Sequence, residues 1–399
     1  MKVLLIDVNC KNSSTGNIVY NLYNYINSSG DEAAVCYGRG PKIEEKNIFK
    51  FGIDAETYLH ALLTRITGFT GCFSFFSTRR LIKYIKEFNP DVVHIHELHA
   101  YFVNIKPLIN FLKQNRIKTV MTLHCEFSYT GKCGHSVECE QWKTECKKCP
   151  HLRNYISTLW FDHTNYMFRS KKLLFKDFEN LSIITPSNWL QKRVKESFLK
   201  DYPISVIHNG VDTDIFCPRN SEYLRNELGI SKHEKVVLAL APHIMTNEKG
   251  GPFVKQLAKG LVGKNIRIIM VGVDGESRRN EDNIILYGPI YDKNKLAELY
   301  SLADLFLICS ERENFPTTCI EAQCCGTPIY GFDTGGTRET ITYTAEKSLV
   351  PYKDIASLQS LILSAPKKTE LSLTQIRKSA LATYSNDIFC EKNMSLYQK

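Results

Sequence analysis

Short apolar runs recur along the first half of the chain and alternate with stretches that have the periodicity of amphipathic helices. The apolar runs lie at residues 3–7, 33–37, 91–96, 118–123 and 181–185. The helical patterns between them include residues 81–88, 105–114 and 188–199. Short buried strands that alternate with helices indicate β-α-β units, in which helices cover both faces of a parallel sheet. We therefore predict an α/β fold for this half.

The same alternation begins again after residues 202–212. Predicted strands follow at residues 235–240, 266–272, 283–287, 304–309 and 327–330, and predicted helices at 251–261, 293–302 and 317–325. Pro203, Pro218 and the turn at Asn209-Gly210 place a domain boundary near residues 203–220. We expect two doubly wound domains whose sheets face a cleft with their carboxyl ends, where ligands of open α/β sheets bind.

Length and composition agree with two globular domains. The 399 residues exceed one typical domain, and a mean hydropathy of −0.23 with 11% aromatic residues excludes wholesale disorder. No window approaches the roughly 18 apolar residues that cross a bilayer, and the first apolar run is too short for a signal peptide. We therefore expect a cytoplasmic chain whose 14 cysteines stay reduced.

Basic residues are concentrated in the first half of the chain. Residues 1–200 hold 28 Lys and Arg against 18 Asp and Glu, whereas the remaining residues hold 23 against 24. One interpretation is an ordinary drift in surface composition. The other is that the first half meets an anionic partner, such as a membrane surface, a phosphorylated lipid or nucleic acid.

The most specific motif lies between a predicted strand and a predicted helix, at residues 310–322. Glu313 falls in the loop at the carboxyl end of the strand, and Glu321 falls about one turn into the helix. Pro316 precedes the helix, so the free N–H groups of Thr317 and Thr318 form a site suited to a diphosphate. Alternatively, the two glutamates are a solvated side chain and an ordinary first-turn carboxylate.

The motifs around this pair resemble those of a known family. Glu313 to Ala322, Gly326-Thr327-Pro328-Ile329 and Gly335-Gly336-x-x-Glu339 resemble the retaining GT-B glycosyltransferases of the E-x7-E group. Lys249-Gly250, Pro186-Ser187 and residues 207–218 extend the resemblance over nearly the whole chain. A closer resemblance is to the bacterial polysaccharide-biosynthesis branch, through Ser14-Thr15-Gly16, Tyr37-Gly38-Arg39-Gly40 and a cysteine-rich segment after Thr122-Leu123-His124.

This resemblance implies a GT-B fold of two Rossmann-like domains and a set of donor contacts. Residues 1–205 would form the acceptor domain with a cysteine-rich insert at 125–150, residues 206–380 the nucleotide-sugar domain, and residues 381–399 a helix that crosses back. Glu313 would contact hydroxyls of the donor sugar, Glu321 the ribose, and Lys249 the diphosphate. His124 would lie at the reaction centre. The remaining expected donor contacts are Gly16, Arg39, Phe315, Pro316, Thr317 and Thr318.

The implied activity is retaining transfer of a sugar from a nucleotide-diphosphate sugar to a growing, lipid-linked surface polysaccharide at the inner face of the membrane. No conventional general base stands out, which is consistent with proton transfer from the acceptor to the leaving phosphate. No Asp-x-Asp follows a predicted strand, so we expect no catalytic metal and no required cofactor. The alternatives are a sugar-nucleotide epimerase of the same fold and a non-enzymatic protein that binds zinc or nucleic acid.

Five cysteines fall within residues 125–149. The spacing of Cys133, Cys139, Cys146 and Cys149 would allow four thiolates to bind one structural zinc ion. Disulfide bonds and freely packed thiols are the other interpretations of these cysteines. Members of the resembled family have His-Asp-Cys-Trp where this chain has His124-Cys125-Glu126-Phe127, so Cys125 is displaced by one position and we do not expect it to be a zinc ligand. A separate histidine group, His94, His96 and His99, follows residues 91–93, and strand alternation puts His94 and His96 on one face. We expect a structural or acceptor-side role for this group, and a metal site is the alternative.

Overall fold

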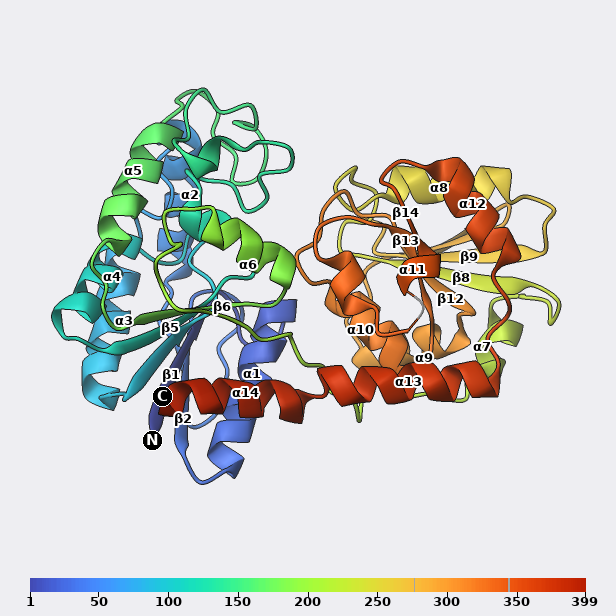
Figure 1. Ribbon diagram of the computed structural model, residues 1–399, viewed down its shortest axis with the longest axis horizontal. Coiled ribbons are helices and arrows are strands. Elements are labelled where there is room, and N and C mark those ends of the chain that lie inside the picture. The colour runs from blue at the N-terminus through green and yellow to red at the C-terminus, as the bar shows by residue number, and fades with distance from the viewer. Residues whose placement is uncertain (276, 344) are drawn as a thin grey trace. The chain divides into compact units, whose positions relative to one another are not determined.

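The computed structural model describes residues 1–275, 277–343 and 345–399. The chain falls into two compact units, Met1–His208 with Phe389–Lys399 and Asn209–Ile388 (Figure 1). The assignment of an acceptor and a donor domain, with limits at residues 205 and 380, stays a prediction. In the part of the chain that the structure describes, no helix has both the length and the apolar character needed to cross a membrane.

The first unit is built on one parallel sheet of seven strands in the order β3-β2-β1-β4-β5-β6-β7. These strands are β1 (Lys2–Asp7), β2 (Glu32–Tyr37), β3 (Ile48–Lys50), β4 (Val92–Ile95), β5 (Lys118–Thr122), β6 (Leu181–Thr185) and β7 (Ile204–Val206). The helices are α1 (Ser14–Ser28), α2 (Asp54–Thr67), α3 (Phe75–Phe88), α4 (Ile105–Gln114), α5 (Thr164–Phe175), α6 (Asn188–Lys195) and α14 (Asn386–Gln398).

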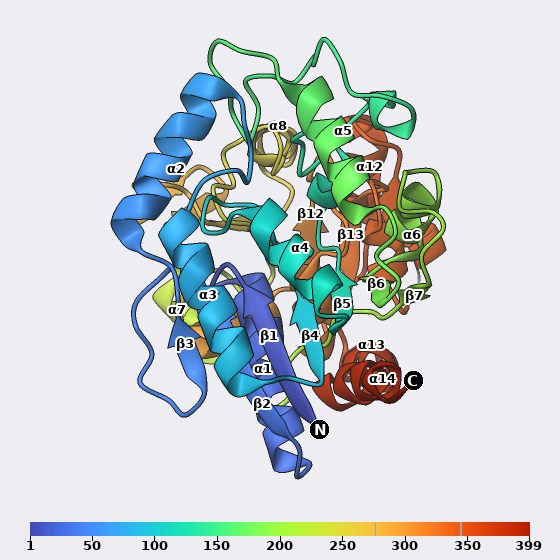
Figure 2. The same ribbon diagram turned by 90° about the vertical axis from the view of Figure 1, so that its left-hand side faces the viewer.

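Both faces of this sheet are buried, as strand alternation requires. Leu4 and Ile6 of β1 face one way and join a core with α3, α4, α5 and α6. Val3 and Leu5 face the other way and join a core with α1 and α14. Figure 2 looks onto the first unit and shows α3 and α4 in front of β1 and β4. The sheet is therefore fixed between two helical layers.

The second unit repeats this architecture with the strand order β10-β11-β9-β8-β12-β13-β14. The strands are β8 (Lys235–Leu240), β9 (Ile266–Val271), β10 (Arg278–Glu281), β11 (Ile284–Tyr287), β12 (Leu305–Ile308), β13 (Ile329–Phe332) and β14 (Leu349–Val350). The helices are α7 (Glu222–Glu227), α8 (Gly251–Gly260), α9 (Lys293–Leu302), α10 (Thr317–Cys324), α11 (Ala345–Ser348), α12 (Ile355–Ser364) and α13 (Glu370–Tyr384). Only the edge pair β10–β11 is antiparallel among the described strands.

The predicted strands and helices are confirmed in both units, and the α/β prediction with them. Helices α7, α9, α10 and α13 share one core with the sheet, and α8 and α12 share the other. The short edge strands β3, β7, β10 and β14 were not predicted, because segments of two to four residues carry no alternation that can be recognised.

Candidate active site

The site in the second unit forms where two neighbouring parallel strands end. Strands β8 and β12 pair directly, so the loop from β8 to α8 and the loop from β12 to α10 leave the same edge of the sheet. Lys249 lies in the first loop and Glu313 in the second, with Lys249 Nζ at 2.7 Å from Glu313 Oε1. Their side chains are 32% and 17% exposed, so the pair stays accessible to a ligand.

Two glycines, one before α8 and one after β13, allow backbone segments at this edge of the sheet to pack closely. Gly250 has a φ of +79°, and a Cβ there would lie 2.0 Å from the carbonyl oxygen of Cys309 at the end of β12. Gly335 has a φ of +58°, and its Cβ would lie 1.9 Å from the carbonyl oxygen of Glu313. Gly336 also donates its N–H to that oxygen at 2.9 Å. Only glycine combines a positive φ with so close an approach, so Gly250 packs against the end of β12 and Gly335 against the carbonyl of Glu313.

Glu321 lies on α10 and is only partly exposed. Burial raises the pKa of Glu321 to about 7, and the hydrogen bond from Tyr300 opposes that rise. The Tyr300 hydroxyl donates to Glu321 Oε2 at 2.8 Å. The carboxyl group is thus held by Tyr300 of α9, and Thr317 at the start of α10 also forms a hydrogen bond with it.

The start of α10 combines a core residue with a helix N-terminus that no side chain caps. Pro316 is the N-cap residue of α10, and no side chain caps the helix there. Thr317 and Thr318 follow and are partly exposed. Phe315 is 6% exposed, and its ring packs edge to face against Tyr384 with centroids 5.8 Å apart. Phe315 therefore anchors the loop in the core, while Thr317 and Thr318 face the accessible side.

The predicted glycine and arginine of the first unit follow β1 and β2. The motif after the first strand suggests that Gly16 lies in the loop before the helix, but Gly16 lies in the first turn of α1, which begins at Ser14. The N–H of Gly16 donates to the N-cap side chain of Ser13 at 2.9 Å, and a Cβ on Gly16 would meet Asn9 at 3.2 Å. Arg39 is half-buried, and its N–H donates to the carbonyl of Val8 at 2.7 Å.

Histidines form a chain of contacts beyond β4 and β5. His94 Nδ1 lies 2.5 Å from the Tyr397 hydroxyl, and His94 Nε2 lies 2.7 Å from Thr122 Oγ1. His96 Nδ1 lies 3.1 Å from His124 Nε2. Burial lowers the pKa of His94 to about 3 and that of His124 to about 4, so both rings are neutral at pH 7. The prediction that His94 and His96 share a face is confirmed, with ring centroids 4.1 Å apart.

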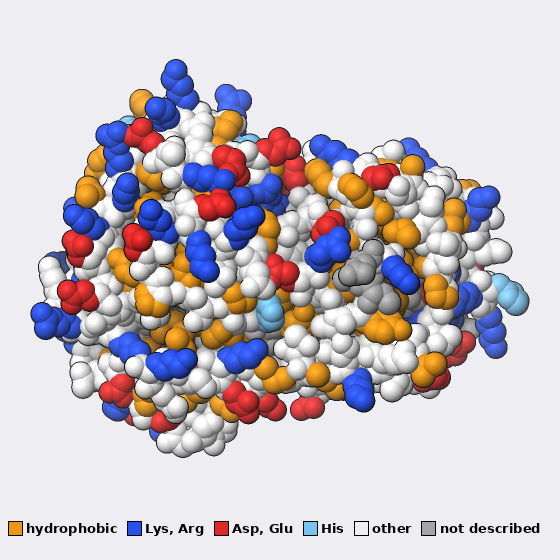
Figure 3. All heavy atoms as spheres, in the orientation of Figure 1, with side chains coloured by type: hydrophobic (Ala, Val, Ile, Leu, Met, Phe, Trp, Pro, Cys, Tyr) orange, Lys and Arg blue, Asp and Glu red, His pale blue; other side chains and the backbone are white. Residues whose placement is uncertain are grey.

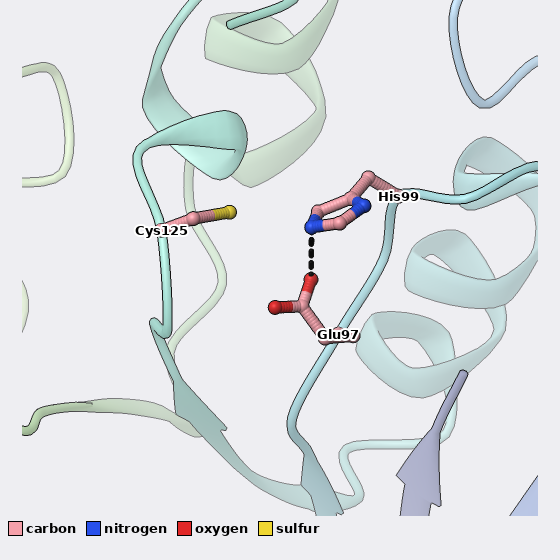
Figure 4. Close-up of side chains that lie close together, drawn as sticks. All are labelled: Glu97, His99 and Cys125. Atoms are coloured by element: carbon pink, nitrogen blue, oxygen red, sulfur yellow. Dashed lines mark ion pairs between the residues drawn. The ribbon is translucent and has the colours of Figure 1, made fainter. Parts of the chain in front are cut away.

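Glu97, His99 and Cys125 form a group that the sequence did not reveal (Figure 4). Glu97 Oε2 lies 2.8 Å from His99 Nε2, and the donor atoms of all three lie within 4.8 Å of one another. Burial lowers the pKa of His99, but Glu97 and Cys125 together raise it by more, so the pKa of His99 lies well above its usual range. Among residues 1–275, 277–343 and 345–399, this is the one three-donor group close enough to hold a metal.

The four cysteines predicted to bind zinc line a single cavity, together with Lys132 and Trp142. No three of their sulfur atoms lie within 4.8 Å of one another in the described chain. All 14 cysteines are described and are free thiols, so the disulfide interpretation is wrong for this structure.

Two family models match the chain. The model "Glycosyltransferase Family 4" matches residues 15–215, and "Glycosyl transferases group 1" matches residues 220–380. WcaC of Escherichia coli, a glycosyl transferase named for colanic acid biosynthesis, is 26% identical over 325 residues, which cover 77% of this chain and 76% of WcaC. The N-acetyl-alpha-D-glucosaminyl L-malate synthase of Bacillus anthracis is 25% identical over 205 residues, 49% of this chain and 52% of that protein.

Solved structures share the fold at low sequence identity. The sucrose-phosphate synthase of Thermosynechococcus elongatus gives a TM-score of 0.69 at 16% identity, covering 100% of this chain and 98% of that one. HepE of Anabaena, solved in complex with UDP-glucose, gives 0.65 at 16% identity and covers both chains completely.

Proposed function

We propose that this chain, which belongs to Glycosyltransferase Family 4 and carries a group 1 glycosyl transferase region, transfers a sugar from a nucleotide-diphosphate donor with retention of configuration. The observation that carries the proposal is the Lys249–Glu313 pair at the carboxyl edge of the second sheet. The product would be a surface polysaccharide on a lipid-linked acceptor, which the similarity to WcaC supports.

Two protein side chains of opposite charge would hold two parts of the donor. The Lys249 ammonium would bind the diphosphate, and the Glu313 carboxylate would accept hydrogen bonds from vicinal hydroxyls of the sugar. The N-terminus of α10, which no side chain caps, would add a positive helix end for the phosphate oxygens. Glu321, already oriented by Tyr300, would accept hydrogen bonds from the ribose.

In the transfer step, the bond between the anomeric carbon and the diphosphate oxygen breaks, and a bond to the acceptor oxygen forms on the same face of the sugar. The acceptor's proton passes to the leaving phosphate, so no protein base is needed. Lys249 stabilises the negative charge that develops on that phosphate, and this stabilisation takes the place of a metal ion. The neutral His124 would offer a hydrogen bond to the sugar without adding a charge.

Replacing Glu313 by Gln tests the assignment. Glu313→Gln keeps the shape of the side chain and removes its charge, and we expect donor hydrolysis or sugar transfer to fall by about 10²-fold or more. Glu311→Gln, in the same loop, is the matched control and should retain activity. NMR of the product should show the anomeric configuration of the donor. Wild-type activity of Glu313→Gln, or an inverted product, would contradict the proposal, and an altered free nucleotide sugar without released diphosphate would indicate the epimerase.

An exposed apolar surface on the first unit supports contact with a membrane. Helix α2 buries polar side chains, namely Thr57, His60 and Thr64, and exposes apolar ones, namely Tyr58, Leu59 and Leu62. Phe75 and Phe76 at the start of α3 are 58% and 66% exposed, and Glu56 of α2 accepts the N–H of Phe76. These five exposed residues form the α2 patch. Exposed apolar groups on adjoining elements mark interaction sites in soluble proteins.

Charge on the same unit favours an anionic lipid surface. Arg65 in the last turn of α2, and Arg79 and Arg80 on α3, are exposed close to the α2 patch in the chain. Figure 3 shows Lys and Arg side chains of the first unit interspersed with Asp and Glu, rather than gathered in a stripe, on the face drawn. Exposed apolar side chains with arginines close to them in the chain suit an anionic lipid surface, so we infer peripheral binding at the inner face of the membrane.

Vesicle sedimentation tests this contact. The double variant Leu59→Glu, Leu62→Glu should lower binding to phosphatidylcholine vesicles that contain phosphatidylglycerol by about tenfold or more, because two leucines no longer enter the lipid. Leu371→Glu, at a 69% exposed position of the second unit, is the matched control. Equal binding of wild type and double variant would contradict the contact.

A further inference from the structure

The cysteine-rich segment is ordered with little regular secondary structure. Between β5 and α5 the described chain contains only the short helices η1 (Phe127–Tyr129) and η2 (Gln141–Lys143). Tyr129 and Trp142 are nevertheless 0% and 1% exposed and pack edge to face, with ring centroids 5.1 Å apart. Small regions without a sheet or helix core commonly need a disulfide or a metal for stability. Because these cysteines form no disulfide, the source of order lies elsewhere.

Four cysteines of the segment surround one cavity. Cys133, Cys139, Cys146 and Cys149 all contribute to its wall. The N–H of Gly131 donates to Cys146 Sγ at 3.3 Å. Four thiols from one short loop are the ligand set of a tetrahedral structural zinc site, and a hydrogen bond to a ligand sulfur is an outer contact that orients such a ligand.

Two buried lysines next to this cavity have no carboxylate partner. The Lys132 ammonium is 1% exposed and donates to the carbonyls of Leu152, Asn154 and Ile156 at 2.8, 3.1 and 2.6 Å. The Lys171 side chain is 3% exposed and donates to the carbonyls of Phe127 and Thr130 at 2.6 and 3.0 Å. Neither lysine forms an ion pair with any of the described residues. A buried cation without a counter-charge is costly, so this arrangement calls for negative charge nearby.

A zinc ion held by four thiolates supplies that charge. Four thiolates and one Zn²⁺ carry a net charge of −2, opposite in sign to the two ammonium groups. The Asp162 carboxylate, which accepts the N–H of Cys149 at 2.7 Å, is a further negative charge that acts on Lys132 but forms no described ion pair with it. Lys132 adjoins Cys133 in sequence and lines the cavity with the four cysteines. Lys171 approaches the same loop through the carbonyl of Thr130, another lining residue.

We propose that Cys133, Cys139, Cys146 and Cys149 bind one structural zinc ion, with Lys132 and Lys171 as its buried counter-charges. The ion enters as Zn²⁺, displaces the four thiol protons to solvent, and draws the four sulfur atoms together around the cavity. No electron transfer is involved. The site is independent of the proposed glycosyltransferase activity, because none of its residues belongs to the donor site.

The metal would fix the wall behind the histidine group of the first unit. Glu126, at the start of the segment, forms a buried ion pair with Arg193 of α6 at 2.6 Å. The ring of Phe127 packs edge to face against His99 with centroids 5.7 Å apart. Loss of the metal should therefore loosen the surroundings of His99 and Cys125 without removing any donor-binding side chain.

Metal analysis of the full-length protein tests the proposal. Wild type purified without chelators should contain about one zinc per chain by plasma mass spectrometry. Cys139→Ser and Cys146→Ser should each lose most of it, whereas Cys125→Ser and Cys217→Ser should retain it. Cobalt exchanged into the wild type should give the absorption bands of tetrahedral thiolate coordination, and removal by a chelator should change the fluorescence of the buried Trp142.

The variants also separate this site from the group at Glu97, His99 and Cys125. Zinc that is retained in Cys139→Ser and Cys146→Ser but lost in Cys125→Ser would overturn the proposal and place the metal at that group. A zinc-free wild type that does not take up cobalt would overturn it as well. If the serine variants fail to fold, X-ray absorption of the wild type decides, because four sulfur neighbours are expected and a mixed nitrogen, oxygen and sulfur shell would contradict the assignment.

Discussion

Lys249 and Glu313 form an ion pair that contributes little to folding stability, and we propose that it serves ligand binding. Both side chains are partly exposed, at 32% and 17%, and such pairs contribute only about 0–1 kcal/mol to stability because water screens them. The fold nevertheless places two glycines, Gly250 and Gly335, where a side chain would collide with the backbone of these loops. A strict backbone requirement around a weak ion pair is expected where the pair serves a ligand.

The partly buried Glu321 predicts a pH dependence of stability. Its pKa is about 7 in the folded state against an ordinary value of 4.5. Between these values the folded state keeps a proton that the unfolded chain has released, so this group makes the free energy of unfolding fall as pH rises. In Glu321→Gln this contribution is absent. Urea unfolding at pH 5 and pH 7.5 should therefore show a smaller loss of stability for the variant, by about 1 kcal/mol or more.

The exposed Glu179 provides the control for that comparison. Glu179→Gln should lose as much stability between the two pH values as the wild type does. The same pH slope in Glu321→Gln and the wild type would contradict the buried, protonated state of Glu321.

At the residue scale, the sequence predicts Lys249, Glu313 and Glu321 as site residues because they belong to ordered motifs around predicted strand ends, and their roles stay a prediction. It did not reveal the contact of Glu97, His99 and Cys125. That contact follows from strand register, since β4 and β5 pair Ile95 with Met121, and four further residues bring His99 opposite Cys125. Register between strands so far apart is set by tertiary packing and is not written in local periodicity.

At the scale of elements, α14 is held to the first sheet by buried polar contacts as well as by apolar packing. Tyr397 shares a hydrogen bond with the buried His94, and its carbonyl accepts a hydrogen bond from Lys118 Nζ at 2.7 Å. Phe389 and Met394 join the apolar core of the same face. Helix α14 therefore belongs energetically to the first unit.

Removing the Tyr397 hydroxyl tests this attachment. Tyr397→Phe keeps the ring but leaves His94 Nδ1 buried without that partner, and we expect a loss of about 1–3 kcal/mol in the free energy of unfolding. Denaturant unfolding monitored by circular dichroism measures it. Lys392→Gln, at an exposed position of the same helix, should change stability by less than about 0.5 kcal/mol. A neutral effect of Tyr397→Phe would show that the hydrogen bond does not hold the helix.

Most elements could be predicted because buried strands and one-sided helices carry clear periodicities. Helix α2 is the exception that matters for function. Its exposed Tyr58, Leu59 and Leu62 and its buried His60 invert the usual pattern, so no helix with an apolar inner face could be recognised there. The same inversion is what marks the α2 patch as an interaction surface.

At the scale of the whole molecule, two units of the same architecture carry different chemistry. The second unit holds the lysine, the two glutamates and the uncapped helix start that would bind the donor under the proposed function. The first unit holds the neutral histidines, the α2 patch and the basic excess of the sequence, and under the same proposal it would meet the acceptor. The proposal thus assigns the charge asymmetry of the sequence to two different ligands.

Thermal unfolding with nucleoside diphosphates tests the central claim most directly. UDP or GDP at 100 times its dissociation constant should add about 2.7 kcal/mol to the stability of the wild type and raise its Tm. Lys249→Met should lose most of that shift, and Lys259→Met, exposed on α8, should keep it. A wild type that neither diphosphate stabilises, or a shift that persists in Lys249→Met, would contradict a donor site built on Lys249.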